Sequence, residues 1–113
     1  MDVIALTIDL GTDKELKPVV KKAVQTGAIK SMIIDAKEVF VNYFLFPALQ
    51  AGALYERTYP LATALGRPLI AKLLVDVAAA EGACAVAHGC TGKGNDQVRF
   101  DVALHTLDPS LQI

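Results

Sequence analysis

Apolar residues along the chain form short continuous runs that alternate with longer segments of helical spacing. Residues 3–8 are a run rich in β-branched side chains, and residues 32–34 and 84–87 are two shorter runs. Runs of this length favour strands that are covered on both faces, as in a parallel sheet. The order strand, helix, strand, helices, strand, loop and helix therefore predicts an α/β fold, a parallel sheet with flanking helices.

Helical spacing of apolar residues predicts the first helices. Thr12 and Glu15 have the spacing of a capping box for the first helix, which is expected to close at Gly27. Pro18 comes late for that start, so it either shifts the start of the helix or bends it. Residues 39–44 then place two apolar pairs at the i, i+4 spacing of a second helical face.

Prolines and polar caps predict the later helices. Pro60 and Pro68 each suit the first turn of a helix, so residues 61–80 are expected to be helical, as one helix or as two pieces. Asn95 or Asp96 is a candidate N-cap for a last helix.

Charge and hydropathy exclude several classes of protein. The chain has 11 basic and 12 acidic residues, which gives no basic footprint for nucleic acid or for an anionic membrane surface. No apolar run reaches the roughly 20 residues of a membrane helix, and the first residues lack the basic region of a secretory signal. Cys84 and Cys90 have neither metal-ligand spacing nor the pattern of a secreted disulfide framework. These observations predict a cytoplasmic protein without a metal site.

The length and the ends of the chain bear on its domain organisation. At 113 residues, of which 53% are apolar, the chain is long enough for one domain with a buried core. It starts directly with a strand of the buried type and ends on the apolar stretch Leu111, Gln112 and Ile113, whereas the ends of a domain are usually expendable. We therefore expect residues 1–113 to be a single, truncated domain.

The stretch with the most chemical information is the glycine-rich segment at residues 87–100, AHGCTGKGNDQVRF. It lies between a predicted strand and a predicted helix, where open α/β sheets bind ligands and where backbone amides favour anions. It is not a Walker A motif, because Ala87 stands where that motif has its first glycine and Gly94 follows Lys93 in place of Ser or Thr. No hydroxyl is therefore placed there for Mg²⁺.

This segment closely resembles the signature of the argininosuccinate synthase family. The resemblance continues without evident gaps through VIALTIDLG, FPALQAGALYE and YPLATALGRPLIAKLL, so it covers essentially all 113 residues. It implies a Rossmann-like fold of the adenine nucleotide alpha hydrolase type, as part of the family's nucleotide-binding domain. The family's pyrophosphate loop, Ser-Gly-Gly-Leu-Asp-Thr-Ser, and its synthetase domain have no match here, and Ala64 stands where some members have a citrulline-contacting serine.

The resemblance implies the ATP-dependent condensation of citrulline with aspartate to argininosuccinate in arginine biosynthesis, with ATP bound as its Mg²⁺ complex. In that family the ureido oxygen of citrulline attacks the α-phosphate of ATP, which gives citrullyl-AMP and releases pyrophosphate. The amine of aspartate then displaces AMP from citrullyl-AMP. Full-length relatives are tetramers, so a homo-oligomer is implied. By resemblance, the binding residues divide as Ile8 and Gly89 for ATP, Thr91, Asn95 and Asp96 for aspartate, and Tyr59, Asn95 and Arg99 for citrulline.

The residue types suit these ligands. Thr91 and Asn95 can donate hydrogen bonds to the carboxylates of aspartate, and Asp96 can pair with its ammonium group. Arg99 lies one turn after Asn95 and offers a planar fork to the carboxylate of citrulline. No acid, base or nucleophile is expected among them, so their contribution would be orientation of the substrates.

Other interpretations stay open for the isolated chain and for single residues. The chain could be an inactive part of the enzyme, a non-catalytic aspartate- or nucleotide-binding module, or a truncated product. His88 is expected to pack in the loop and not to act as an acid or base, and Cys90 lacks an identifiable base that would make it a nucleophile. Asp9 is expected to accept hydrogen bonds from its loop. For Lys93 two alternatives stay open, a side chain that faces solvent and one that lies near a bound phosphate.

Overall fold

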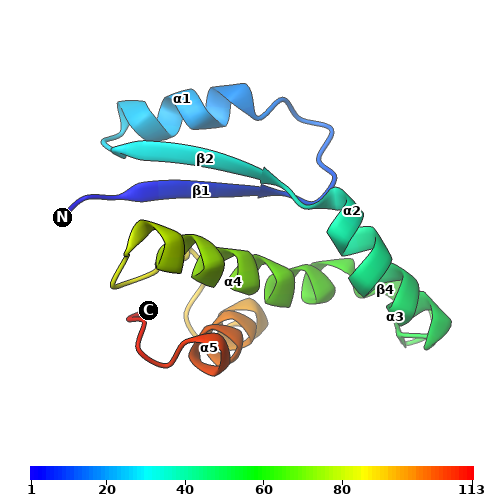
Figure 1. The fold of residues 1–113 in the computed structure, drawn as a ribbon. Helices are drawn as coiled ribbons and strands as arrows, with labels where there is room; N and C mark the ends of the chain where they lie inside the picture. The colour runs from blue at the N-terminus through cyan, green and yellow to red at the C-terminus, as the bar shows by residue number, and fades with distance from the viewer. The chain divides into compact units, whose positions relative to one another are not determined.

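The computed structural model describes all residues, 1–113, and Figure 1 draws the order of their helices and strands. The chain divides into two compact units, Met1–Tyr43 and Phe44–Ile113. The single domain expected from the length of the chain stays a prediction. None of the helices combines the length and the apolar composition needed to cross a membrane.

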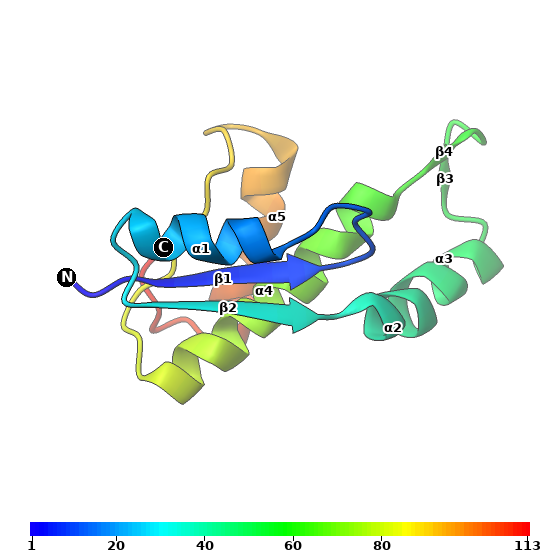
Figure 2. The same ribbon diagram turned by 90° about the horizontal axis from the view of Figure 1, so that it is seen from above.

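The first unit is a strand–helix–strand element. It consists of β1 (Ile4–Asp9), α1 (Lys17–Gln25) and β2 (Lys30–Asp35). The two strands are parallel and in register from Ile4 opposite Lys30 to Asp9 opposite Asp35. Parallel neighbours need a crossover connection, and Figures 1 and 2 show α1 lying along one face of the pair as that connection. The predicted combination of parallel strands and flanking helices is confirmed.

The start of α1 differs from the prediction. The helix begins at Lys17 with Leu16 as its N-cap and Pro18 in its first turn, and no side chain caps it. The capping box predicted from Thr12 is wrong, because the Thr12 hydroxyl accepts a hydrogen bond from the Lys14 N–H (3.2 Å) and residues 10–16 form a loop. Pro18 is pre-set for a first turn, and this local preference outweighs the cap signal upstream.

Asp9 organises the loop after β1, as expected. Its Oδ1 accepts hydrogen bonds from the N–H groups of Gly11 (2.9 Å) and Thr12 (3.0 Å), and its Oδ2 lies 3.1 Å from Lys37 Nζ. These two backbone donors, followed by the Lys37 ammonium group, lower the pKa of Asp9 from 3.8 to about 2. Asp9 therefore ties the end of β1 both to the loop that follows it and to Lys37, just after β2.

Residues 37–50 are helical in three consecutive pieces. These are α2 (Lys37–Phe40), the π-helical turn η1 (Val41–Leu45) and α3 (Phe46–Gln50). The helical face predicted at residues 39–44 is confirmed. Pro47 lies in the first turn of α3, where its missing N–H needs no partner, so the change of helix type occurs just before the proline.

The second unit contains a short hairpin and two longer helices. The hairpin pairs β3 (Leu54–Tyr55) with β4 (Tyr59–Pro60) in antiparallel fashion, and the helices are α4 (Ala62–Glu81) and α5 (Asn95–Leu107). Residues 61–80 were expected to be helical, and α4 confirms this as one continuous helix.

The positions predicted for two prolines are wrong. Pro60 belongs to β4, and Pro68 lies inside α4 and not in a first turn. Pro68 cannot donate the usual backbone hydrogen bond. The helix nevertheless continues through Pro68, which is exposed.

The third predicted strand, at residues 84–87, does not form. The segment makes a single parallel bridge, Ala85 opposite Gln112, in which Val86 N–H donates to Gln112 O (2.8 Å) and Gln112 N–H donates to Cys84 O (3.2 Å). A strand needs a partner over several residues, and in this unit the segment meets only the Gln112 region. Its apolar composition serves the core instead, where Val86 is buried.

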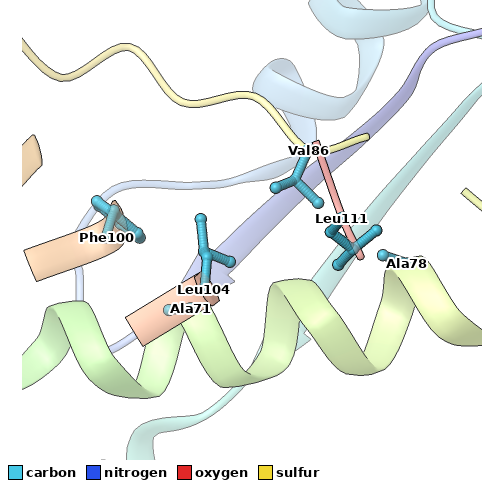
Figure 3. Close-up of a cluster of buried hydrophobic side chains, with 6 residues drawn as sticks. All are labelled: Ala71, Ala78, Val86, Phe100, Leu104 and Leu111. Carbon is cyan, nitrogen blue, oxygen red and sulfur yellow. The ribbon is translucent and has the colours of Figure 1, made fainter. Parts of the chain in front are cut away.

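One apolar core holds the second unit together. Figure 3 shows its members meeting from α4, from α5 and from the segments around Val86 and Leu111, which are joined by the bridge between Ala85 and Gln112. They are Ala71, Ala78, Val86, Phe100, Leu104 and Leu111. Phe100 and Leu104 lie one turn apart on α5, so the same face of that helix meets α4. This packing fixes the N-terminus of α5 and the loop that precedes it.

Candidate active site

The glycine-rich loop at residues 88–94, here called the signature loop, ends in a tight turn that starts α5. Gly94 is the N-cap of α5, and its N–H donates to Thr91 O (3.1 Å). A Cβ atom at position 94 would lie 2.9 Å from that same oxygen, so the turn requires glycine. The expectation that Asn95 or Asp96 caps the helix is wrong, because both lie within its first turn and no side chain caps it.

A surface cavity of about 630 Å³ opens beside the signature loop. Its lining comes from β4, the start of α4, the loop and the first turns of α5, all within the second unit. The residues are Tyr59, Leu61, Thr63, Ala64, Arg67, Gly89, Cys90, Thr91, Gly94, Asn95, Asp96 and Arg99. All the binding residues implied by the family resemblance are therefore brought together here except Ile8. Ile8 is on β1, in the other unit.

Asp96 is the best-organised charged group of this cavity. Its Oδ2 accepts a hydrogen bond from Arg67 Nη2 (2.8 Å), and its Oδ1 accepts one from Arg99 Nη1 (3.1 Å). The Arg67 guanidinium, and after it the Arg99 guanidinium, lower the pKa of Asp96 below its ordinary value. The cavity therefore presents an ionised carboxylate in a fixed orientation.

Arg67 is a site residue that was not identified from the sequence. It comes from the second turn of α4, its side chain is 28% exposed, and its guanidinium carbon lies 5.8 Å from the centre of the Phe100 ring. Its Nε is buried and donates no hydrogen bond within the chain. The sequence did hold a signal for a functional role, because Arg67 is the only charged residue between Arg57 and Lys72.

Polar side chains of the cavity, among them Thr91, Asn95 and Tyr59, remain available to a ligand. Thr91 and Asn95 are exposed, and neither side chain makes a hydrogen bond within the chain. Tyr59 is 56% exposed and lines the same cavity from β4. Asn95 and Arg99 lie four positions apart on α5, so they share a helical face as expected. The arrangement places neutral donors from β4, the loop and the first turn of α5 beside the paired charges of Asp96 and its two arginines.

Of the remaining residues of the signature loop, His88 and Cys90 are packed, whereas Lys93 is exposed. The His88 ring stacks on Phe100 with 5.0 Å between the ring centres, and its Nε2 lies 3.3 Å from Asp101 Oδ1, which confirms the expected packing role. Cys90 packs against the core. Lys93 is exposed and has a positive φ of 65°. No three His, Cys, Asp or Glu side chains lie close enough together to hold a metal ion.

Known proteins with similar sequences cover the whole chain. A family sequence profile described as "Arginosuccinate synthase N-terminal HUP domain" matches residues 1–113. Curated relatives named argininosuccinate synthase are 62% identical in Oceanobacillus iheyensis, 60% in Thermosynechococcus vestitus and 59% in Nostoc sp., each over 112 residues. The match covers 99% of this chain but only 27% or 28% of each relative's length. The HUP description agrees with the parallel strand–helix–strand element of the first unit and confirms the predicted fold class.

Proposed function

Because the chain belongs to the argininosuccinate synthase family, we propose that it binds aspartate and citrulline for their ATP-dependent condensation. The proposed reaction is the one that the family resemblance implies, in which citrulline is adenylated by ATP with release of pyrophosphate and the amine of aspartate then displaces AMP. The observation that carries the proposal is the ionised Asp96 carboxylate, held by Arg67 beside Thr91 and Asn95 in one cavity.

Aspartate is the ligand that the loop side of the cavity suits best. Its carboxylates match the free hydroxyl of Thr91 and the free amide of Asn95, next to the N-terminus of α5, where the helix dipole favours negative charge. Its ammonium group matches Asp96. The ammonium replaces Arg99 at Oδ1, because the Arg99 contact is longer than the Arg67 contact at Oδ2.

Citrulline would occupy the other side of the cavity. Arg99, once released from Asp96, offers two parallel donors to the citrulline carboxylate, with Asn95 and Tyr59 beside it. Ala64 lines this side and supplies no hydroxyl. The exchange of partners at Asp96 would link the binding of the two amino acids, since aspartate frees the arginine that citrulline needs.

ATP, bound as its Mg²⁺ complex, completes the proposed set of substrates. Gly89 would contact it through backbone atoms of the signature loop, and Ile8 would contact it from β1. None of these residues is proposed as an acid, base or nucleophile, so the contribution of the chain is to hold the reacting groups in line. A cytoplasmic homo-oligomer, a tetramer as in full-length relatives, is the proposed assembly.

Calorimetric titration of the chain with aspartate, citrulline and Mg-ATP tests the proposal. The Asp96→Asn variant is expected to lower aspartate affinity by about 10- to 100-fold, the effect of losing a charged hydrogen-bond partner. Asp108→Asn, at the other end of α5, is the matched control and should leave affinity unchanged. A chain that binds none of the three substrates would contradict the proposal, and an assay of AMP release separates turnover from binding alone.

A further inference from the structure

Three side chains that are not part of the cavity lining connect both ends of the signature loop to α5. His88 is in the loop, and Gln97 and Asp101 are one turn apart on the helix. Cys90 N–H donates to His88 Nδ1 (3.3 Å), and His88 Nε2 lies 3.3 Å from Asp101 Oδ1. Gln97 Nε2 donates to Asp101 Oδ2 (3.1 Å), and Lys93 N–H donates to Gln97 Oε1. We call this connected set His88, Gln97 and Asp101 the clasp.

The hydrogen bonds of the clasp determine one another. Because His88 Nδ1 accepts from a backbone N–H, the neutral ring carries its proton on Nε2, where it points to Asp101. Asp101 uses one oxygen for His88 and the other for the amide of Gln97, which orients the Gln97 oxygen toward Lys93. The His88 side chain is only 14% exposed and stacks on Phe100 within 20° of parallel. The network is therefore directional, and its His88 end is shielded from water, whereas the Asp101 side chain is 41% exposed.

The clasp holds the loop in a conformation that it would not adopt unaided. Lys93 has a positive φ, which an L-residue with a side chain seldom adopts. Its N–H is bound by Gln97, and the N–H of Cys90 is bound by His88. The N–H groups of Thr91 and Gly92, between these two anchors, have no partner within the chain. The anchored amides thus fix the loop and leave the middle amides available.

We infer that His88, Gln97 and Asp101 are positioning residues that preorganise the signature loop for its anionic ligand. The inference rests on the proposed function for the identity of that ligand, but the network itself is independent of it. A loop that is already ordered before binding loses less conformational freedom on association, so affinity is higher. None of the three side chains lines the site cavity, so their effect on a ligand is transmitted through the loop backbone.

A ring substitution tests the His88 end of the clasp. His88→Phe keeps an aromatic ring to stack on Phe100 but removes both ring nitrogens. We expect amide hydrogen exchange at Cys90, measured by NMR, to become at least about tenfold faster, and aspartate affinity to fall about tenfold, as for loss of one or two hydrogen bonds. His105→Phe is the matched control, because His105 is on the same helix, lines the neighbouring cavity with His88 and Asp101, and takes no part in the clasp.

A pair of compensating substitutions tests the direction of the network. Asp101→Asn leaves either His88 Nε2–H or the Gln97 amide facing an NH₂ group in place of an oxygen, and Gln97→Glu sets two carboxylates against each other. Each single variant should therefore weaken the network and lose protection at Lys93 N–H, at Cys90 N–H or at both. The double variant Gln97→Glu with Asp101→Asn restores every donor and acceptor. Its carboxylate at position 97 accepts from Lys93 and from the amide at position 101, and the oxygen of that amide accepts from His88.

We expect the double variant to regain most of the protection at Lys93 N–H and most of the aspartate affinity. A general loss of packing would not be rescued in this way. A double variant no better than either single variant would show that the direction of the hydrogen bonds does not matter, and the inference would fail.

The ¹⁵N signals of the His88 ring in the unsubstituted chain provide a readout that does not depend on any variant folding. They should report a proton on Nε2 and none on Nδ1. A ring protonated at Nδ1, or equal exchange and affinity in the His88→Phe and His105→Phe variants, would overturn the inference. A chain whose Cys90 and Lys93 amides are protected, but which binds none of the three substrates, would show that the clasp forms. It would overturn the role of the clasp in binding and, with it, the proposed function.

Discussion

In the turn after β1 an aspartate accepts hydrogen bonds directly from backbone N–H groups, whereas in the signature loop an aspartate orients the side chains that accept them. The two aspartates act over very different distances along the chain. Asp9 binds the amides two and three residues after it. The signature loop instead depends on Asp101, 13 positions from His88, and its cavity depends on Arg67, 29 positions from Asp96. A turn closed by its neighbours can form by itself, whereas the loop requires α4 and α5 to be packed first. The substitutions below test this difference.

The largest expected effect breaks the tight turn of the loop. In Gly94→Ala the new Cβ would lie 2.9 Å from the backbone oxygen of Thr91, which cannot move without opening the turn. We expect a loss of about 1–3 kcal/mol in the free energy of unfolding, typical of overpacking, and a loss of aspartate binding. Chemical denaturation and calorimetry measure the two effects.

Gly92→Ala is the matched control for that turn. A Cβ at Gly92 meets no atom within 4 Å, and the backbone there is not in the left-handed region. The control should remain close to the unsubstituted chain in both measurements. Equal behaviour of the two alanine variants would show that the turn at Gly94 adapts easily, and the proposed dependence of the loop on its geometry would fail.

The next effect concerns the long-range ion pair in the cavity. Arg67→Met removes the shorter of the two guanidinium contacts to Asp96, so the pKa of Asp96 should rise toward its ordinary value. We expect aspartate affinity to fall about tenfold, because the carboxylate loses its strongest orienting partner. An NMR titration of the carboxyl carbon and calorimetry would measure these changes. Lys72→Met, which breaks an exposed pair with Asp76 on the same helix, should alter neither.

The acid dependence of stability tests the local turn. Asp9 has a folded pKa of about 2 against an ordinary 3.8, so the unfolded chain takes up a proton first as the pH falls. Asp9 therefore stabilises the fold above about pH 4, and this contribution is lost between about pH 4 and pH 2. Asp9→Asn should flatten the unfolding free energy across that window, as followed by denaturant titration at each pH.

Lys37→Met sharpens the same measurement. The backbone donors of Gly11 and Thr12 lower the pKa of Asp9 more than the Lys37 side chain does. The Lys37→Met variant should therefore keep most of the acid dependence seen in the unsubstituted chain. If it behaved like Asp9→Asn, the turn would rely on a partner 28 positions away and would not be a local structure.

The smallest expected effect adds one donor to the cavity. Ala64→Ser introduces a hydroxyl on the side proposed for citrulline, where some members of the family have serine. One neutral hydrogen bond corresponds to a gain of about two- to tenfold in citrulline affinity. Aspartate affinity, measured in the same calorimetric series, should not change. If aspartate affinity rose instead, Ala64 would lie on the aspartate side of the cavity, and the proposed positions of the two amino acids would be wrong.

Most of the secondary structure could be predicted from the sequence, and the errors occurred where a local signal competed with the rest of the chain. The strands of the first unit follow from continuous apolar runs. The helices α4 and α5 were expected, but the prolines and polar caps from which they were predicted do not occupy the expected positions. The capping box at Thr12 did not start a helix, and the run at residues 84–87 did not form a strand, because it pairs with the rest of the unit only at Gln112. Polar caps and short apolar runs are compatible with more than one partner.

The grouping of Tyr59, Thr91, Asn95, Asp96 and Arg99 in one cavity follows from the order of the elements together with the family motif, so these positions could be anticipated. The partner of Asp96 could not. A guanidinium has no local pattern that reveals its partner, and Arg67 reaches Asp96 only because α4 and α5 pack side by side.

The sequence by itself determined the strands of the first unit, the longer helices, the family of the chain and the chemical types of its binding residues, since these depend on periodicity and on a long contiguous motif. Only the tertiary structure decided which atoms meet: Arg67 with Asp96, and His88 with Asp101. These contacts join residues far apart in the chain, and they exist because Phe100 and Leu104 bury one face of α5 in the core and thereby fix what its other faces present.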